Sequence, residues 1–269
     1  MLRQLSKNVF DYLQGGAREF KKSKNIILLY LLGVFAVASL VYYVDTHTDA
    51  GLRRLTFKYV VFDYATLMKA IIVCCTGVYF VQTFLQKYRR VKISRGTIFR
   101  CLMWSLAILI ISNIIIHYIH YVTFIYFTSI YRDAATSAMP YAFPLLKCFI
   151  ISLIIGVTGF YPFLVFEGDP NPFRNGLLRM SGMRLSLVAA LVIIWMIYFI
   201  ATSGLRFLTQ YVLTEVVPEP YLRLDSLYAM AALFYTLRVF FIILSVATIT
   251  TAYLKATMGK NLKNPKTRN

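Results

Sequence analysis

Positive charge alternates with six long apolar segments along this chain, and this pattern limits the possible folds more than any other feature. Twenty of the 29 lysine and arginine residues lie in four stretches, together with only four of the 11 acidic residues. The basic stretches, which fall at every second gap between apolar segments, are residues 1–24, 87–100, 166–184 and 255–269. Short loops rich in lysine and arginine stay on the cytoplasmic side of a membrane. The pattern therefore predicts six membrane spans with both ends of the chain in the cytoplasm.

The overall composition is typical of a protein with most of its length inside a membrane. Hydrophobic residues make up 59% of the chain, charged residues make up 15%, and the mean hydropathy is +0.64. A soluble domain usually has roughly 25% charged residues, so this chain has too little polar surface for a water-soluble globule. Because lipid offers no water to backbone N–H and C=O groups, the spans must be helices. We predict an all-α fold, a polytopic membrane bundle of about six transmembrane helices.

Three regions are expected along the chain. Residues 1–24 are predicted to form a basic amphipathic helix at the membrane interface, bent or interrupted near Gly15 and Gly16. Residues 25–256 hold the six spans, and residues 257–269 form a basic tail. The apolar residues that recur at helical spacing on one face of the first helix are Leu2, Leu5, Val9, Leu13, Ala17 and Phe20.

Five of the spans are expected at residues 25–44, 60–86, 101–127, 185–203 and 227–253. The remaining span, the fourth, is expected to run from a turn at Pro140 and Pro144 to Phe166. The first span is too long for a cleavable signal sequence and is interpreted as a signal anchor. We expect a bacterial inner membrane. The alternative is a mitochondrial inner membrane, since mitochondrial transit peptides are also amphipathic and basic. Residues 204–220 are predicted to form a short interfacial or re-entrant helix.

The formal net charge of +18 predicts anionic partners. Because the basic residues flank membrane spans and no nucleic-acid-binding motif accompanies them, we expect anionic phospholipids rather than nucleic acid. Other membrane protein subunits are the second expected class of partner, since the basic tail is able to dock an acidic surface.

No cofactor is expected. The cysteines are interpreted as small hydrophobic residues rather than disulfide partners or metal ligands, and they are Cys74, Cys75, Cys101 and Cys148.

Arg238 is the foremost single candidate for function. It lies well inside the sixth span, where an arginine costs about 2.5–3.5 kcal/mol on insertion scales. One interpretation is that it binds an anionic substrate or headgroup, or couples to a gate. The other is that it snorkels outward or bonds carbonyls inside the bundle. Lys69, Lys147 and Arg206 also lie towards the outer side, and with Arg238 they would form a basic lining if all four share a cavity.

Three further polar residues lie in the third span. His117 and His120 are three residues apart and therefore share a helix face. Zinc usually needs three or four protein ligands, and the chain has three histidines in all. We therefore favour an ordinary interfacial cluster over a metal site. Asn113 is expected to join helices by hydrogen bonds, as polar groups in apolar spans usually do.

Glu167 and Asp169 are the acidic residues of the loop after the fourth span. A pair of carboxylates is typical of acid–base chemistry. However, Asp169-Pro170 and Asn171-Pro172 each resemble a helix N-cap followed by proline at the first helical position. We favour capping, which needs no chemistry.

The same loop has a distinctive order of residues. A span ends with proline and aliphatic residues, an acidic-glycine turn follows, and a short helix with leucine and serine comes next. The positions are Pro162, Leu164, Glu167, Gly168, Leu178 and Ser181. In this order the loop resembles YciC-like bacterial six-span inner-membrane proteins and the membrane domain of some glycerophosphodiester phosphodiesterases. The resemblance implies a bacterial inner-membrane location and carries over no catalytic residue.

The chain has no GxSxG, HExxH, Walker or dinucleotide-binding motif. We expect a non-enzymatic protein, and the leading hypothesis is a scaffold or accessory subunit of a larger membrane complex. One alternative is a small transporter or channel for an anionic solute, which depends on Arg238. The other is a lipid-handling protein, which depends on the first helix and the basic inner face.

Overall fold

The computed structural model describes residues 2–47, 54–57, 60–89, 91, 93–130, 145–146, 148–211 and 220–258. Lys147, the predicted turn at Pro140 and Pro144, residues 212–219 and the tail after Met258 lie outside these ranges.

In the described part of the chain, six helices are long and apolar enough to cross a membrane, which confirms the predicted all-α polytopic bundle. The chain is therefore a multi-pass membrane protein. The candidate spans are Lys24–Tyr43, Met68–Gln86, Arg95–Ile119, Cys148–Glu167, Arg184–Thr209 and Ala229–Thr257.

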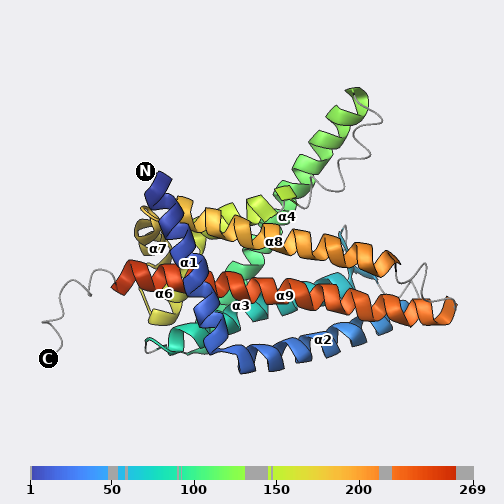
Figure 1. Cartoon of the computed structure of the whole chain (residues 1–269), viewed down its shortest axis with the longest axis horizontal. Helices are drawn as coiled ribbons and strands as arrows, with labels where there is room; N and C mark the ends of the chain where they lie inside the picture. The colour runs from blue at the N-terminus through green and yellow to red at the C-terminus, as the bar shows by residue number, and fades with distance from the viewer. Residues whose placement is uncertain are drawn as a thin grey trace, which may run out of the picture.

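The elements follow the chain in the order α1 (Leu2–Lys22), α2 (Lys24–His47), β1 (Arg54–Phe57), β2 (Val60–Asp63), α3 (Tyr64–Gln86), α4 (Arg95–Ile130), α6 (Tyr161–Glu167), α7 (Pro172–Met180), α8 (Arg184–Tyr211) and α9 (Pro220–Met258). Residues 148–158 are also helical and lead into α6. Helices α2, α3 and α8 pack along α9, and α1 crosses α9 near α6 and α7 (Figure 1). We call the end of the bundle formed by α1, α6, α7 and the last turns of α9 the basic end.

A two-stranded hairpin precedes α3 and was not expected from the sequence. β1 and β2 are antiparallel, with Arg54 opposite Asp63 and Phe57 opposite Val60. The second span was predicted to begin at residue 60, but α3 begins at Tyr64. The β-branched and aromatic residues between β1 and α3 favour strands over helix, which accounts for the later start.

Helix α8 extends farther than predicted. The fifth span was expected to end at residue 203, with a separate short helix from residue 204. Instead α8 continues without a break to Tyr211. A single glycine inside a helical pattern is tolerated, so Gly204 does not end the helix. Apart from Pro220, where α9 begins, the rest of the predicted short helix lies outside the described residues.

Helix α9 forms the centre of the core. It contacts α1, α2, α3 and α8 (Figure 1). Ala232, Val239, Ile243, Ala247 and Tyr253 on this helix are fully buried. Small residues let helix backbones approach each other closely inside a membrane, so the alanines allow several helices to pack on α9 together.

Helix α1 packs across α9 through its pair of glycines. The helix is unbroken from Leu2 to Lys22, so the predicted interruption at Gly15 and Gly16 is wrong. A Cβ atom added at Gly16 would overlap the Thr248 side chain and lie 3.0 Å from the Thr248 Cα. The glycines therefore allow a close helix crossing rather than break the helix.

The face that α1 buries overlaps the predicted one, since Val9, Leu13 and Phe20 pack in the core, but it is rotated from it. Ala17 was expected on the apolar face and is exposed, whereas Tyr12 and Glu19 are buried. Phe20 meets Phe240 of α9 edge to face, with ring centroids 4.9 Å apart. The contact with α9 thus sets the rotation of α1, and the apolar spacing of α1 alone did not indicate it.

We expect Gly16→Ala to lower the thermal unfolding temperature of the detergent-purified protein by several degrees. The added methyl group would push α1 away from Thr248, and overpacking of this kind costs about 1–3 kcal/mol. Gly33→Ala in α2 is the matched control, because an added Cβ there meets no atom within 4 Å. Since alanine is the better helix former, the control should melt at or above the wild-type temperature. Equal melting of the two variants in scanning fluorimetry would contradict a close α1–α9 contact.

Candidate functional site

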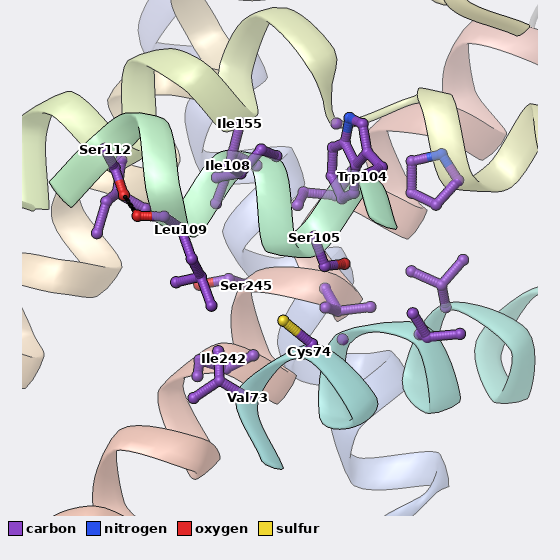
Figure 2. Close-up of a pocket in the computed structure, with 18 of the residues that line it drawn as sticks. Val73, Cys74, Trp104, Ser105, Ile108, Leu109, Ser112, Ile155, Ile242 and Ser245 are labelled. Atoms are coloured by element: carbon purple, nitrogen blue, oxygen red, sulfur yellow. Dashed lines mark hydrogen bonds between the residues drawn. The ribbon is translucent and has the colours of Figure 1, made fainter. Parts of the chain in front are cut away.

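A cavity of about 120 Å³ lies inside the bundle. Its walls come from α3, α4, the helical residues 148–158, α6, α8 and α9. Figure 2 shows Cys74 of α3, Leu109 of α4 and Ile242 of α9 around it, and most of the lining is aliphatic or aromatic. An apolar cavity of about 150 Å³ is enough to bind benzene. The cavity is somewhat smaller than that and, as it stands, has room for a short segment of an acyl chain.

The serine hydroxyls in the cavity wall are already hydrogen-bonded within their own helices. Ser105 and Ser112 of α4 each donate to a carbonyl of the preceding turn at 3.0 Å (Figure 2 draws the Ser112 bond). Ser245 of α9 does the same at 2.8 Å. This local bonding is a common use of serine hydroxyls in helices. The three hydroxyl hydrogens are therefore not free for a ligand.

Arg238 and Trp195 both line the cavity. Arg238 of α9 is half-buried and has no carboxylate at ion-pair distance in the described part of the chain. Trp195 of α8 is only 7% exposed, and its buried indole N–H has no hydrogen-bond partner among the described residues. Buried polar groups in folded proteins are nearly always paired. The Trp195 N–H is shut off from the cavity space, so it is Arg238 that favours a ligand bringing an acceptor into the cavity.

The other basic residues predicted to share a cavity with Arg238 lie elsewhere. Lys69 lines a separate small pocket between α2, α3 and α9, and its ammonium lies 4.4 Å from an aromatic ring centroid of α2. Arg206 is exposed near the end of α8, with its guanidinium over a ring of α9. Lys147 lies outside the described residues. The structure thus separates Lys69 and Arg206 from the cavity, because the packing of each helix decides which of its faces turns inward.

The polar residues predicted in the third span follow α4. Asn113 and His117 are exposed, and neither lines the cavity. The side chain of His120 lies outside the description. Among the described residues, no three His, Cys, Asp or Glu side chains come close enough to hold a metal ion. The four cysteines are free thiols, and Cys74 is part of the cavity wall.

An ionic cluster closes the basic end of the bundle. It consists of Arg89, Glu167, Asp169, Arg179 and Tyr253. Arg89 donates to Glu167 at 2.6 Å, and Arg179 lies 4.0 Å from Glu167 and 3.8 Å from Asp169. Arg179 also donates to the Tyr253 hydroxyl at 3.4 Å. Glu167 is only 16% exposed, so the two guanidinium groups compensate a carboxylate that is largely removed from solvent.

The predicted capping role of the loop acids is right in one respect and wrong in others. Pro172 occupies the first turn of α7 after Asn171, as expected, but the Asn171 side chain makes no capping hydrogen bond. Asp169 accepts from the Asn171 backbone N–H at 2.9 Å and from the Asn175 side-chain amide at 2.8 Å. No helix begins at Pro170. Asp169 therefore shapes the loop before α7, and a proline follows it without starting a helix.

The ionic cluster reaches the cavity through an aromatic contact. Tyr253 stacks on Phe163 with ring centroids 4.9 Å apart, and Phe163 lines the cavity. Helix α6 thus carries a cavity residue at its start and Glu167 at its end. Sequence reasoning missed the ion pairs because Arg89 lies 78 residues before Glu167 in the chain. The available signal was that Glu167 and Asp169 are the only acidic residues of the 166–184 stretch, in a chain with many basic residues.

A scan against protein-family models and searches of curated proteins and of solved structures found no match to this chain. The resemblance to YciC-like proteins therefore stays a prediction. The fold and the site define a class of protein: a multi-pass membrane protein of six apolar helices with a mainly apolar cavity inside the bundle.

A double-mutant cycle measures how strongly the ionic cluster holds the basic end together. We expect Glu167→Gln or Arg89→Gln alone to destabilise the protein by about 1–3 kcal/mol, because each leaves a partly buried charge without its partner. The double variant should lose less than the sum of the two single losses.

The exposed pair Asp11 and Lys255, which lie 2.9 Å apart, provides the control for this cycle. Asp11→Asn and Lys255→Gln should change the unfolding temperature little, since exposed ion pairs contribute little to stability. Strictly additive losses at Glu167 and Arg89 would show that the two side chains do not interact.

Proposed function

We propose that this multi-pass membrane protein is non-enzymatic and binds an anionic amphiphile, a molecule with an acidic head and an apolar chain, inside its helical bundle. Such binding serves lipid handling or the transport of an anionic solute with an apolar part. The observation that carries the proposal is the position of Arg238 in the wall of an otherwise mainly apolar cavity.

The charge of Arg238 favours an anionic ligand. On insertion scales an arginine in the middle of a membrane helix costs about 2.5–3.5 kcal/mol, and no carboxylate pairs with Arg238 among the described residues. A ligand carboxylate or phosphate would accept charge-assisted hydrogen bonds from the guanidinium. A neutral ligand would leave the guanidinium without a counter-charge.

The rest of the cavity favours an apolar chain. On α9 the lining residues run from Arg238 to Ile249, which is about 16 Å along a helix that rises 1.5 Å per residue. Phe163 closes the end away from Arg238, and the ionic cluster lies behind it. A small inorganic anion would occupy only the Arg238 end. An amphiphile with its acid group at Arg238 and its chain towards Phe163 would use both parts.

We also infer that the basic end faces the cytoplasm of a bacterial inner membrane. The support is the concentration of lysine and arginine in the loops at that end, which the positive-inside rule assigns to the cytoplasmic side. Arg238 then lies in the outer half of the Ala229–Thr257 span and Ile249 in its inner half. The acid-binding end of the cavity would therefore be nearer the outer face of the membrane.

Two variants separate binding of the head from binding of the chain. Arg238→Gln removes the cation. Gly77→Leu adds an apolar side chain to the cavity wall, at a position where an added Cβ meets no atom within 4 Å. We expect Arg238→Gln to weaken binding of a fluorescent fatty acid about tenfold or more, since a hydrogen bond to a charged group contributes ~1.5–3 kcal/mol. Binding of the matching fatty alcohol should change little, whereas Gly77→Leu should weaken binding of both ligands.

Arg206→Gln is the matched control, because Arg206 is an exposed cation outside the cavity. It should bind the acid and the alcohol as the wild type does in a fluorescence titration. Unchanged affinity for the acid in Arg238→Gln, or for both ligands in Gly77→Leu, would refute the proposal.

A role as a scaffold or accessory subunit is a second candidate, and α4 favours it. Figure 1 shows the C-terminal half of α4 extending away from the other helices. Large apolar residues are exposed along this helix, and they include Ile110, Ile111, Ile114, Tyr118 and Tyr121. A membrane helix of another subunit would cover this face.

Purification of the tagged protein in mild detergent, followed by mass spectrometry, tests the second candidate. An accessory subunit would carry other membrane proteins in fixed stoichiometry, and Ile114→Trp would release them by crowding the exposed face of α4. Leu29→Trp, on a similarly exposed apolar face of α2, should retain them. A solitary, monodisperse wild-type protein would contradict the accessory role.

A further inference from the structure

The acidic residues of the four basic stretches all have partners within this chain. Glu167 at the end of α6 and Asp169 just after it belong to the ionic cluster. Asp11 of α1 pairs with Lys255 of α9 at 2.9 Å, and this hydrogen bond lowers the pKa of Asp11 from its ordinary value. Glu19 is buried on α1 and pairs with Lys22 at 2.8 Å. Each carboxylate is therefore taken up by its own ion pair, which leaves the other cations of these stretches without a counter-charge.

The surface of the basic end is consequently cationic. Several exposed lysine and arginine side chains there have no carboxylate at ion-pair distance in the ranges that the structure describes. These side chains are Lys7, Arg18, Lys21, Lys24, Arg95, Arg100 and Arg174.

Helix α1 arranges three of these cations in a line on its exposed face. Lys7, Phe10, Gln14, Arg18 and Lys21 follow one another at spacings of three and four residues, so they share one face of the helix. All five are exposed, and Phe10 is 62% exposed despite being aromatic. We call these five residues the outer stripe. The stripe lies opposite the face that α1 buries against α9, so it is the part of the helix left for a partner.

The junction between α1 and α2 holds the outer stripe next to the membrane. Only Ser23 separates α1 from α2, the first candidate span. The Ser23 N–H donates to the Phe20 carbonyl at 3.0 Å, and the Ser23 carbonyl accepts from the Ile27 N–H at 3.0 Å. The chain thus passes from α1 into the span through a hydrogen-bonded turn. Together with the packing on α9, this turn fixes which way the stripe faces.

We propose that the outer stripe of α1 is a binding surface for the anionic headgroups of phospholipids in the leaflet at the basic end. Phosphate oxygens would accept hydrogen bonds from Lys7, Arg18 and Lys21. Phe10 would enter the boundary between headgroups and acyl chains, the usual position of an aromatic residue on an interfacial helix. Because the other face of α1 is buried against α9, the helix presents a fixed cationic surface and does not insert. The surface selects lipids by headgroup charge.

The test places a fluorescent probe in the stripe. Phe10→Trp is made in a background with Trp104→Phe and Trp195→Phe, and the protein is reconstituted into vesicles of phosphatidylglycerol and phosphatidylcholine. In one preparation the phosphatidylglycerol is brominated, and in the other the phosphatidylcholine is. We expect clearly stronger quenching by the brominated anionic lipid. The preference should disappear in about 0.5 M NaCl, where charge interactions extend only a few ångströms, and in the Lys7→Gln, Arg18→Gln, Lys21→Gln variant.

Leu29→Trp in the same background is the matched control, because Leu29 is 74% exposed on the apolar surface of α2. It should be quenched equally by the two brominated lipids, and this quenching also shows that the background has folded and inserted. Equal quenching of Phe10→Trp by both lipids would overturn the selectivity for anionic headgroups. Quenching of Phe10→Trp by iodide in the water but by neither lipid would overturn the proposal in favour of an acidic soluble partner.

Discussion

The packing of α9 against α1, α2, α3 and α8 is the interaction on which the rest of this structure depends. The same helix supplies Arg238 and Ile249 to the cavity and Tyr253 to the ionic cluster. It also meets the glycines of α1 through Thr248 and Thr251. Because the hydrophobic effect contributes little between helices surrounded by lipid, close van der Waals contact has to stabilise such a bundle. Alanine, threonine and glycine at these contacts provide it.

Hydroxyl groups that are hydrogen-bonded within their own helix have a structural role, which leaves other polar groups as candidates for function. The buried hydroxyls of Ser245, Thr248 and Thr250 on α9 all donate to carbonyls of the preceding turn. At the basic end, the acids pair with lysine or arginine side chains of the same chain. Against this background, the half-buried Arg238, which has no carboxylate at ion-pair distance among the described residues, stands out. It lies in the wall of the cavity, and the cavity is therefore where we place a ligand.

The sequence predicted the features of this protein that follow from local composition. The six spans and the all-α class came from apolar length and charge alternation, which operate within single segments. The features that depend on distant segments were not predictable in this way. The glycine pair of α1 was interpreted as an interruption because its partner, Thr248, lies at the other end of the chain. The bonding of Glu167 to Arg89 was missed for the same reason.

The candidate site was predicted in part. Arg238 was recognised because a cation inside a span is costly wherever it faces, and the structure places it on a cavity. Lys69 and Arg206 were grouped with it by depth alone, but depth says nothing about the rotation of a helix. Trp195 was not singled out, since a tryptophan in an apolar span gives no sign of an unpartnered N–H. Only the packed bundle shows that its donor is buried without an acceptor.

The most direct test of the central claim is a structure of the protein determined by electron cryomicroscopy in a nanodisc made with its native lipids. We predict elongated density in the cavity, with one end in contact with Arg238 and Trp195 and the remainder along α9 towards Phe163. A cavity closed by its own side chains, with Arg238 paired to a carboxylate of the same chain, would contradict the account.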